Sequence, residues 1–159
     1  MSQRAKEISG RIKTLSEKVI AFVENLSEKD WTKKCEWEEW PVGATAYHMG
    51  VGHFAISDMA GMILRGEDLP PLSMDQINAM SNKQALKHVD CTKADALEAL
   101  RENSANMVAF VDGLSDEELD LKGSMPAFGG EVTTEQLIAF VIFESAAQHF
   151  DSMKAAVTK

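Results

Sequence analysis

Residues 3–26, with the sequence QRAKEISGRIKTLSEKVIAFVENL, decide the fold class of this chain. Their apolar side chains recur at alternating spacings of three and four, which places them on one face of a helix of about six turns. This stripe consists of Ala5, Ile8, Ile12, Leu15, Val19, Phe22 and Leu26. An amphipathic helix has to bury its apolar stripe, so the stretch predicts a packed helical domain.

Three further long helices are predicted from similar patterns and from residues that favour helix ends. They span residues 41–65, then residues from Asp90 or Thr92 to Leu114, and finally residues from Thr133 or Thr134 to about Ala156. The glycines at positions 50, 52 and 61 lower the helix propensity of the second helix, so we expect close helix packing there.

The connection between the second and third helices, residues 67–91, holds Pro70-Pro71 and a short amphipathic piece at residues 74–86. No stretch alternates cleanly enough to predict a sheet. We therefore expect an all-α fold, a four-helix bundle with a crossover connection between helices two and three. The length of 159 residues suits a single domain over residues 1–159.

Net charge, cysteine content and hydropathy limit the partners and the cellular location that we expect. The net charge of −9 argues against a nucleic-acid partner and against binding to an anionic membrane surface. Cys35 and Cys91 are far apart and form no CxxC motif, so we expect two inert thiols in a reducing compartment. No signal peptide and no apolar run of about 20 residues is present, which favours a cytoplasmic protein.

Two distant histidines fall on inward faces of predicted helices. His48 shares a face with Gly52, Ala55, Met59 and Met62 on the second helix, and His149 shares one with Ile138, Ile142, Ser145 and Met153 on the fourth. A single histidine on an apolar face is more often a hydrogen-bonded core residue than a ligand. The pair is better evidence, because two imidazoles that meet in a bundle core are part of a metal site.

The same helical geometry assigns the remaining polar residues. At 100° per residue, His53 lies about 140° from His48 and is expected to face a loop or solvent. Glu144 lies about 140° from His149, whereas Ser145, four residues before His149, shares its face. His88 lies in the crossover and receives no role. Trp31, Trp37 and Trp40 are expected to cover the open end of the bundle, and Met49, Met59 and Met62 to fill the core or line a pocket.

Four features together resemble the DinB-like superfamily of four-helix bundles, which includes mycothiol-dependent maleylpyruvate isomerases and other bacterial thiol-dependent transferases. They are Leu-Ser-Glu-Lys-Asp-Trp at residues 26–31, the Trp40-to-His48 entry to the second helix, Leu-Ser-Asp-Glu-Glu-Leu at residues 114–119, and the polar residues of the fourth helix. The Trp40-to-His48 spacing is the most specific of them.

The resemblance implies a divalent metal, often zinc or nickel, held by three side chains. His48 matches the ligand on the second helix, and His149 matches the second of two ligands spaced four apart on the fourth helix. Ser145 stands where the remaining ligand is expected, and a serine hydroxyl is a weak donor. Either a π-bulge brings Glu144 onto the core face or a substrate group completes the site; otherwise the metal is absent or weakly held.

Two classes of function follow from the sequence. The first is a metal-assisted transferase or isomerase that uses a low-molecular-weight thiol, with His48 and His149 as ligands. The second is a metal-free protein that binds a small ligand or acts as a dimeric scaffold, and the resemblance favours a homodimer. Because no nucleophile-and-base pair, phosphate loop or cofactor motif is present, catalytic and cofactor-binding residues stay unassigned and enzymatic activity stays open.

Overall fold

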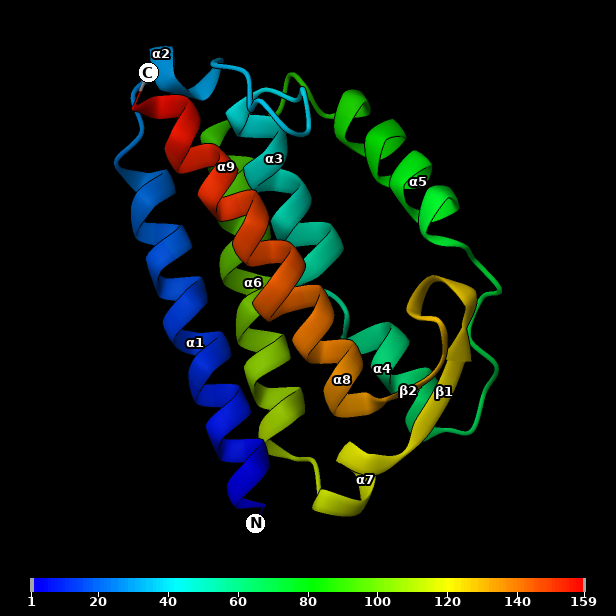
Figure 1. Cartoon of the computed structure of the whole chain (residues 1–159). Helices are drawn as coiled ribbons and strands as arrows, with labels where there is room; N and C mark the ends of the chain where they lie inside the picture. The colour runs from blue at the N-terminus through cyan, green and yellow to red at the C-terminus, as the bar shows by residue number, and fades with distance from the viewer. Residues whose placement is uncertain (1, 159) are drawn as a thin grey trace.

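α1 (Gln3–Glu24) and α6 (Lys93–Asp112) lie side by side and antiparallel, and they form the regular half of a four-helix bundle (Figure 1). The computed structural model describes residues 2–158. Along α1 the predicted stripe faces inward, with Ala5, Ile12 and Val19 fully buried. The prediction of an all-α bundle is thereby confirmed.

The other half of the bundle consists of two rods that each change helix type midway. The first contains α3 (Val42–His48), the π-helical segment η1 (Met49–His53) and α4 (Ser57–Leu64). The second contains α8 (Thr134–Ile138), the π-helical segment η3 (Ala139–Ala146) and α9 (Ala147–Val157). The two π segments contact each other. In η1 the Phe54 amide donates to the Met49 carbonyl at 3.0 Å, the i to i+5 bond of a π turn.

Side-chain caps begin most of the helices, as the sequence predicts. Thr92 and Thr133 cap α6 and α8, each with a closed capping box. The same chemistry starts three shorter helices: Ser27 caps α2 (Glu28–Trp31), Ser73 caps α5 (Met74–Lys87), and Ser115 caps α7 (Asp116–Asp120). These caps satisfy amide groups at the helix N-termini and so fix where each of these helices begins.

A small hairpin corrects the expectation that no sheet forms. β1 (Lys122–Met125) pairs antiparallel with β2 (Gly130–Thr133), with Lys122 opposite Thr133. A single 3₁₀ turn at Pro126–Phe128 connects the strands, and Gly129 and Gly130 supply the positive φ angles that the turn requires. Strands of four residues are too short to show an alternating pattern, so the sequence does not reveal them.

α5 lies outside the bundle, beside α3 (Figure 1). Ala85 is the one residue of this helix that is buried. The crossover therefore crosses the outside of the molecule and covers one side of the α3–η1 rod. None of the helices within residues 2–158 combines the length and the apolarity that a membrane span needs.

The three glycines of the first rod, at positions 50, 52 and 61, have different surroundings. A methyl group at Gly50 would lie 3.0 Å from Ala99 and from the Leu100 backbone of α6, so the predicted close packing is confirmed there. At Gly61 a methyl group would meet only Arg65 of the same rod, so close interhelical packing is wrong for that position. A methyl group at Gly52 would lie 3.0 Å from the imidazole of His48, which therefore occupies the space that this glycine leaves.

Candidate metal centre

Three histidines converge where the two irregular rods face each other. His48 ends α3, His53 ends η1, and His149 lies in α9. Their ring centroids are 5.0 Å apart for His48 and His53, 5.4 Å for His48 and His149, and 4.9 Å for His53 and His149. One ligand atom from each ring lies within 4.8 Å of the other two, so the group could hold a metal ion.

The position of His53 corrects the sequence-based expectation that it faces a loop or solvent. Its side chain is buried among the rods. An α-helix would turn residues five apart away from each other, but each turn of a π-helix holds about one more residue. His48 and His53, separated by the π turn of η1, consequently lie on the same face. The two glycines between His48 and His53 could have indicated an irregular helix, because irregular helical turns tolerate glycine.

Each imidazole is oriented by a hydrogen bond at Nδ1. Nδ1 of His48 lies 2.9 Å from Oε1 of Gln84 in α5, and Nδ1 of His53 lies 2.9 Å from the Val141 carbonyl in η3. Nδ1 of His149 lies 2.7 Å from Oε2 of Glu38. A carbonyl and a carboxylate only accept hydrogen bonds, so these Nδ1 atoms donate. Nε2 is then the atom that remains on each ring for a metal.

Glu38 reaches the site from a tightly closed loop between α2 and α3. The Cys35 amide donates to the Trp40 carbonyl at 2.8 Å, and the Val42 amide donates to the Lys33 carbonyl at 2.7 Å. Glu39, with φ of 62°, sits in the left-handed region inside this loop. The Glu38 side chain is 8 % exposed, and its Oε1 accepts a hydrogen bond of 2.6 Å from Ser152.

Sequence reasoning missed Glu38 and Gln84. Glu38 stands among Glu36 and Glu39 in a charged loop, and nothing in its spacing separates it from them. Gln84 is one of several amides of the crossover helix. Only the folded positions of the loop and of α5 distinguish these two residues.

Burial keeps two of the histidines uncharged. Burial and, secondarily, the charge of His149 lower the pKa of His48 to about 4 and that of His53 to about 3. Burial raises the pKa of Glu38, but hydrogen bonds from His149 and Ser152 outweigh it and hold this pKa below its ordinary value. Neutral imidazoles beside an ionised carboxylate are the protonation states that a metal site requires.

The donor set fits a divalent transition metal. Imidazole suits zinc and nickel, and three protein ligands with one side open characterise catalytic zinc sites. A cavity of about 730 Å³ lies against the three histidines. The open side of the site therefore faces a space that can admit a small molecule.

Glu144 and Ser145, expected as alternatives for the third ligand, both line this cavity. A π-helical segment does precede His149, but Glu144 stays exposed and is outside the converging group of ligand atoms. The structure brings His48 and His149 together with His53. His53, and not Glu144, is therefore the third member of the group that could hold a metal ion.

Trp40 covers the three histidines on one side. Its indole stacks on His149 with centroids 5.6 Å apart and meets the edge of His48 at 5.0 Å. Its Nε1 donates to Oδ1 of Asn82 in α5 at 2.9 Å. Trp31 also packs inside, where it donates to the Cys91 carbonyl, whereas Trp37 is 66 % exposed. The expectation that all three tryptophans cover the bundle is therefore wrong for Trp37.

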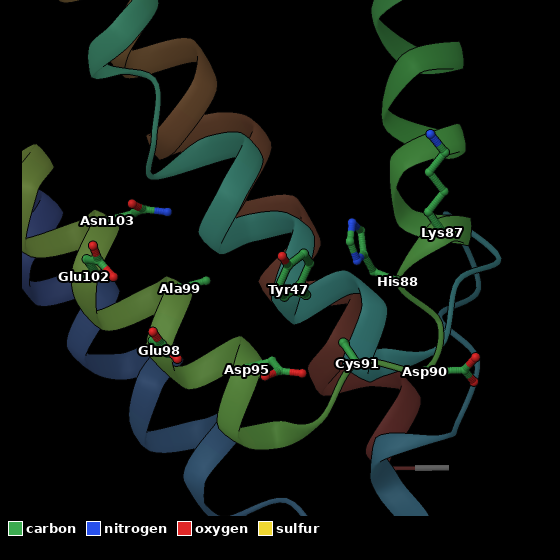
Figure 2. A pocket seen from close by; sticks show the side chains of 10 residues that line it. All are labelled: Tyr47, Lys87, His88, Asp90, Cys91, Asp95, Glu98, Ala99, Glu102 and Asn103. Atoms are coloured by element: carbon green, nitrogen blue, oxygen red, sulfur yellow. The ribbon is translucent and has the colours of Figure 1, made fainter.

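A second cavity of about 540 Å³ lies between α3, α6 and the end of α5 (Figure 2). Carboxylates dominate its lining, including Asp90, Asp95 and Glu98. His88, which was assigned no role from the sequence, contacts Tyr47 there in a tilted arrangement, with ring centroids 4.5 Å apart. No group of three converging metal-binding side chains lies in this cavity among the described residues.

The two cysteines are poor nucleophiles, as expected. Cys35 is buried, and burial raises the pKa of its thiol. Burial and the nearby charge of Asp95 raise the pKa of Cys91 to about 11. Both thiols therefore stay protonated at neutral pH.

Comparison with known proteins agrees with this architecture. The family model described as the DinB superfamily matches residues 11–150, which is most of the chain. The protein belongs to the DinB superfamily. No significant match was found among curated proteins or among solved structures.

Proposed function

We propose that this protein is a metal-dependent enzyme in which His48, His53 and His149 hold zinc or nickel at the base of the larger cavity. The observation that carries the proposal is the hydrogen bond at each Nδ1, which leaves three Nε2 atoms for one ion. Core histidines are hydrogen-bonded as well, but here each of the three rings also brings one ligand atom within 4.8 Å of the other two, which supports a shared ion.

The open side of the site and the resemblance to thiol-dependent enzymes support one class of reaction. A bound divalent metal would act as a Lewis acid toward a thiol or carbonyl group. Glu38 orients His149 and supplies a negative charge, and Trp40 shields the histidines on one side. The resemblance to thiol-dependent transferases and isomerases supports a transfer or isomerisation that uses a low-molecular-weight thiol.

Elemental analysis of the purified protein, repeated after exposure to zinc and to nickel, tests this function. We expect one ion per chain. His53→Ala should weaken zinc binding by at least about 100-fold, because losing a direct ligand costs more than losing an outer partner. His88→Ala, which removes a histidine of the second cavity, is the matched control and should bind zinc like the wild type.

Two results would contradict the proposal. Wild-type protein that stays free of metal after both exposures would favour the alternative of a metal-free ligand-binding protein. Equal zinc affinity in His53→Ala and the wild type would place the ion elsewhere in the molecule.

A further inference from the structure

We propose that the larger cavity, defined here as the histidine cavity, selects a small molecule with an apolar body and at most one negative charge. The body would contact α4, α5 and η3, and the head group would face the three histidines. The lining of the cavity by itself supports an apolar body, whereas the role of the head group rests on the proposed function.

The wall beyond the histidines is apolar. Ile56 and Met59 line it from the first rod, Ile77 and Met80 from α5, and Phe128 and Phe140 from the hairpin turn and η3. The two phenylalanine rings meet edge to face with centroids 5.2 Å apart. A volume of about 730 Å³ with such a lining suits a ligand of drug-like size that buries most of its surface.

The charges around the cavity exclude a polyanion. Among the described residues, no lysine or arginine lines it, and its two carboxylates are Glu38 and Glu144. Glu38 is already bonded to His149 and Ser152. Recognition of phosphate or sulfate uses Arg, Lys or helix N-termini, so a sugar phosphate or nucleotide would find no cationic partner along this wall. A single negative charge could be balanced only beside the histidines.

α5 makes the outer wall of the cavity and ties it to the site. Gln84 of this helix accepts from His48, and Asn82 accepts from Trp40. Met80 is 57 % exposed and stands at the rim. Ile77 is only partly buried against the core and Met80 is largely exposed, and an apolar ligand beneath the helix would cover both side chains further.

A series of probes of increasing chain length measures how much the apolar body contributes to binding affinity. Acetohydroxamate, hexanohydroxamate and octanohydroxamate are titrated by calorimetry into the zinc-loaded protein, and hexanol and octanol are titrated into metal-free protein. We expect the affinity to rise about two- to fourfold for each added methylene, because every buried methylene contributes transfer free energy. Octyl phosphate should bind the zinc-loaded protein more weakly than octanohydroxamate.

Two variants of α5 locate the binding. Ile77→Asp introduces a charge into the apolar wall and should weaken octanohydroxamate at least tenfold. Ala79→Asp adds the same charge to the same helix at an exposed position outside the lining, and its affinity should stay within twofold of wild type. Met80→Asp, at a largely exposed position, repeats the test without risk to the fold.

The outcomes separate this inference from the metal proposal. If zinc and all hydroxamates bind but chain length has no effect, the apolar-body inference is wrong and the metal site stands. If zinc does not bind but octanol binds metal-free protein more tightly than hexanol, the inference stands and the metal proposal is wrong. Tighter binding of octyl phosphate than of octanohydroxamate, or equal affinities in Ile77→Asp and Ala79→Asp, would overturn the inference.

Discussion

The regular pair α1–α6 and the irregular pair of rods that contain η1 and η3 bury different kinds of side chain. The buried polar residues of α1 and α6 are Ser9, Ser16 and Ser104, whose hydroxyl groups do not titrate at physiological pH. The irregular rods also bury the hydroxyl residues Thr45, Thr134 and Ser152, but only they bury histidines, namely His48 and His53. Regular α-turns align residues three and four apart and serve packing, whereas the π turn aligns residues five apart and serves to aim ligands.

The largest expected effect is the acid sensitivity of the irregular pair. His48 and His53 have pKa values of about 4 and about 3 in the folded protein, against 6.5 when unfolded. Below pH 6.5 the unfolded chain therefore binds more protons, and the free energy of unfolding falls with pH. Each histidine should contribute a loss on the order of 3 kcal/mol by pH 4, at about 1.4 kcal/mol per pKa unit.

Urea denaturation of metal-free protein between pH 7 and pH 4.5 measures this loss. The lowered carboxylate pKa values lie below that window, so the histidines dominate it. His53→Asn should flatten the dependence. A midpoint that stays constant from pH 7 to pH 4.5 would show that the histidines are not buried as described.

A cavity in the regular pair should reduce stability without affecting the site. Ile12 is fully buried in α1, so Ile12→Ala should lower the free energy of unfolding by about 2–5 kcal/mol. The zinc affinity of the folded variant should stay within twofold of wild type, as measured by calorimetry below the unfolding transition. A tenfold loss of affinity would mean that the two pairs are coupled.

Glu38 and Glu39 give a matched test of how the site is oriented. Glu38→Gln removes the charge that faces His149 and should weaken zinc binding about 10- to 100-fold, as other losses of outer hydrogen-bond partners do. Glu39→Gln makes the same change at the exposed neighbouring position and should have no effect on competition with a zinc-binding dye. Equal losses in both variants would point to the net charge of the loop instead.

The smallest effect is expected from shortening the π turn itself. Deletion of Val51 places His48 and His53 of the first rod four residues apart, and an α-helix aligns that spacing on one face. We expect zinc binding to persist, within about tenfold of wild type. An α turn with the histidines four residues apart should place both rings on one face, as the π turn does with the histidines five residues apart. Replacement of Val51 by Ala without deletion is the control. Complete loss of binding only in the deletion variant would show that the π turn supplies more than alignment.

The sequence predicts most of the fold because helix boundaries are encoded locally. Thr92 and Thr133 begin two of the long helices through capping chemistry that a short stretch of sequence contains. The hairpin escapes prediction for the opposite reason. Its close approach to Ile63 and Leu69 at Gly123 is a contact between distant parts of the chain.

Only part of the candidate metal site can be predicted from the sequence. His48 and His149 follow from apolar faces that ideal helical geometry identifies. His53 does not, since one wide turn shifts its direction and five residues are too few to change the observed periodicity. Glu38 is missed because a loop has no periodicity, and its aim depends on the closure between Cys35 and Trp40.

The hydrogen bond from His53 to the Val141 carbonyl has a genetic consequence. Gln84 and Glu38 can each be lost through one codon change, but the acceptor of His53 belongs to the main chain. Any residue at position 141 that preserves the η3 backbone still presents that oxygen. A mutational scan of this protein would therefore register the orienting partners of two histidines and remain blind to the third.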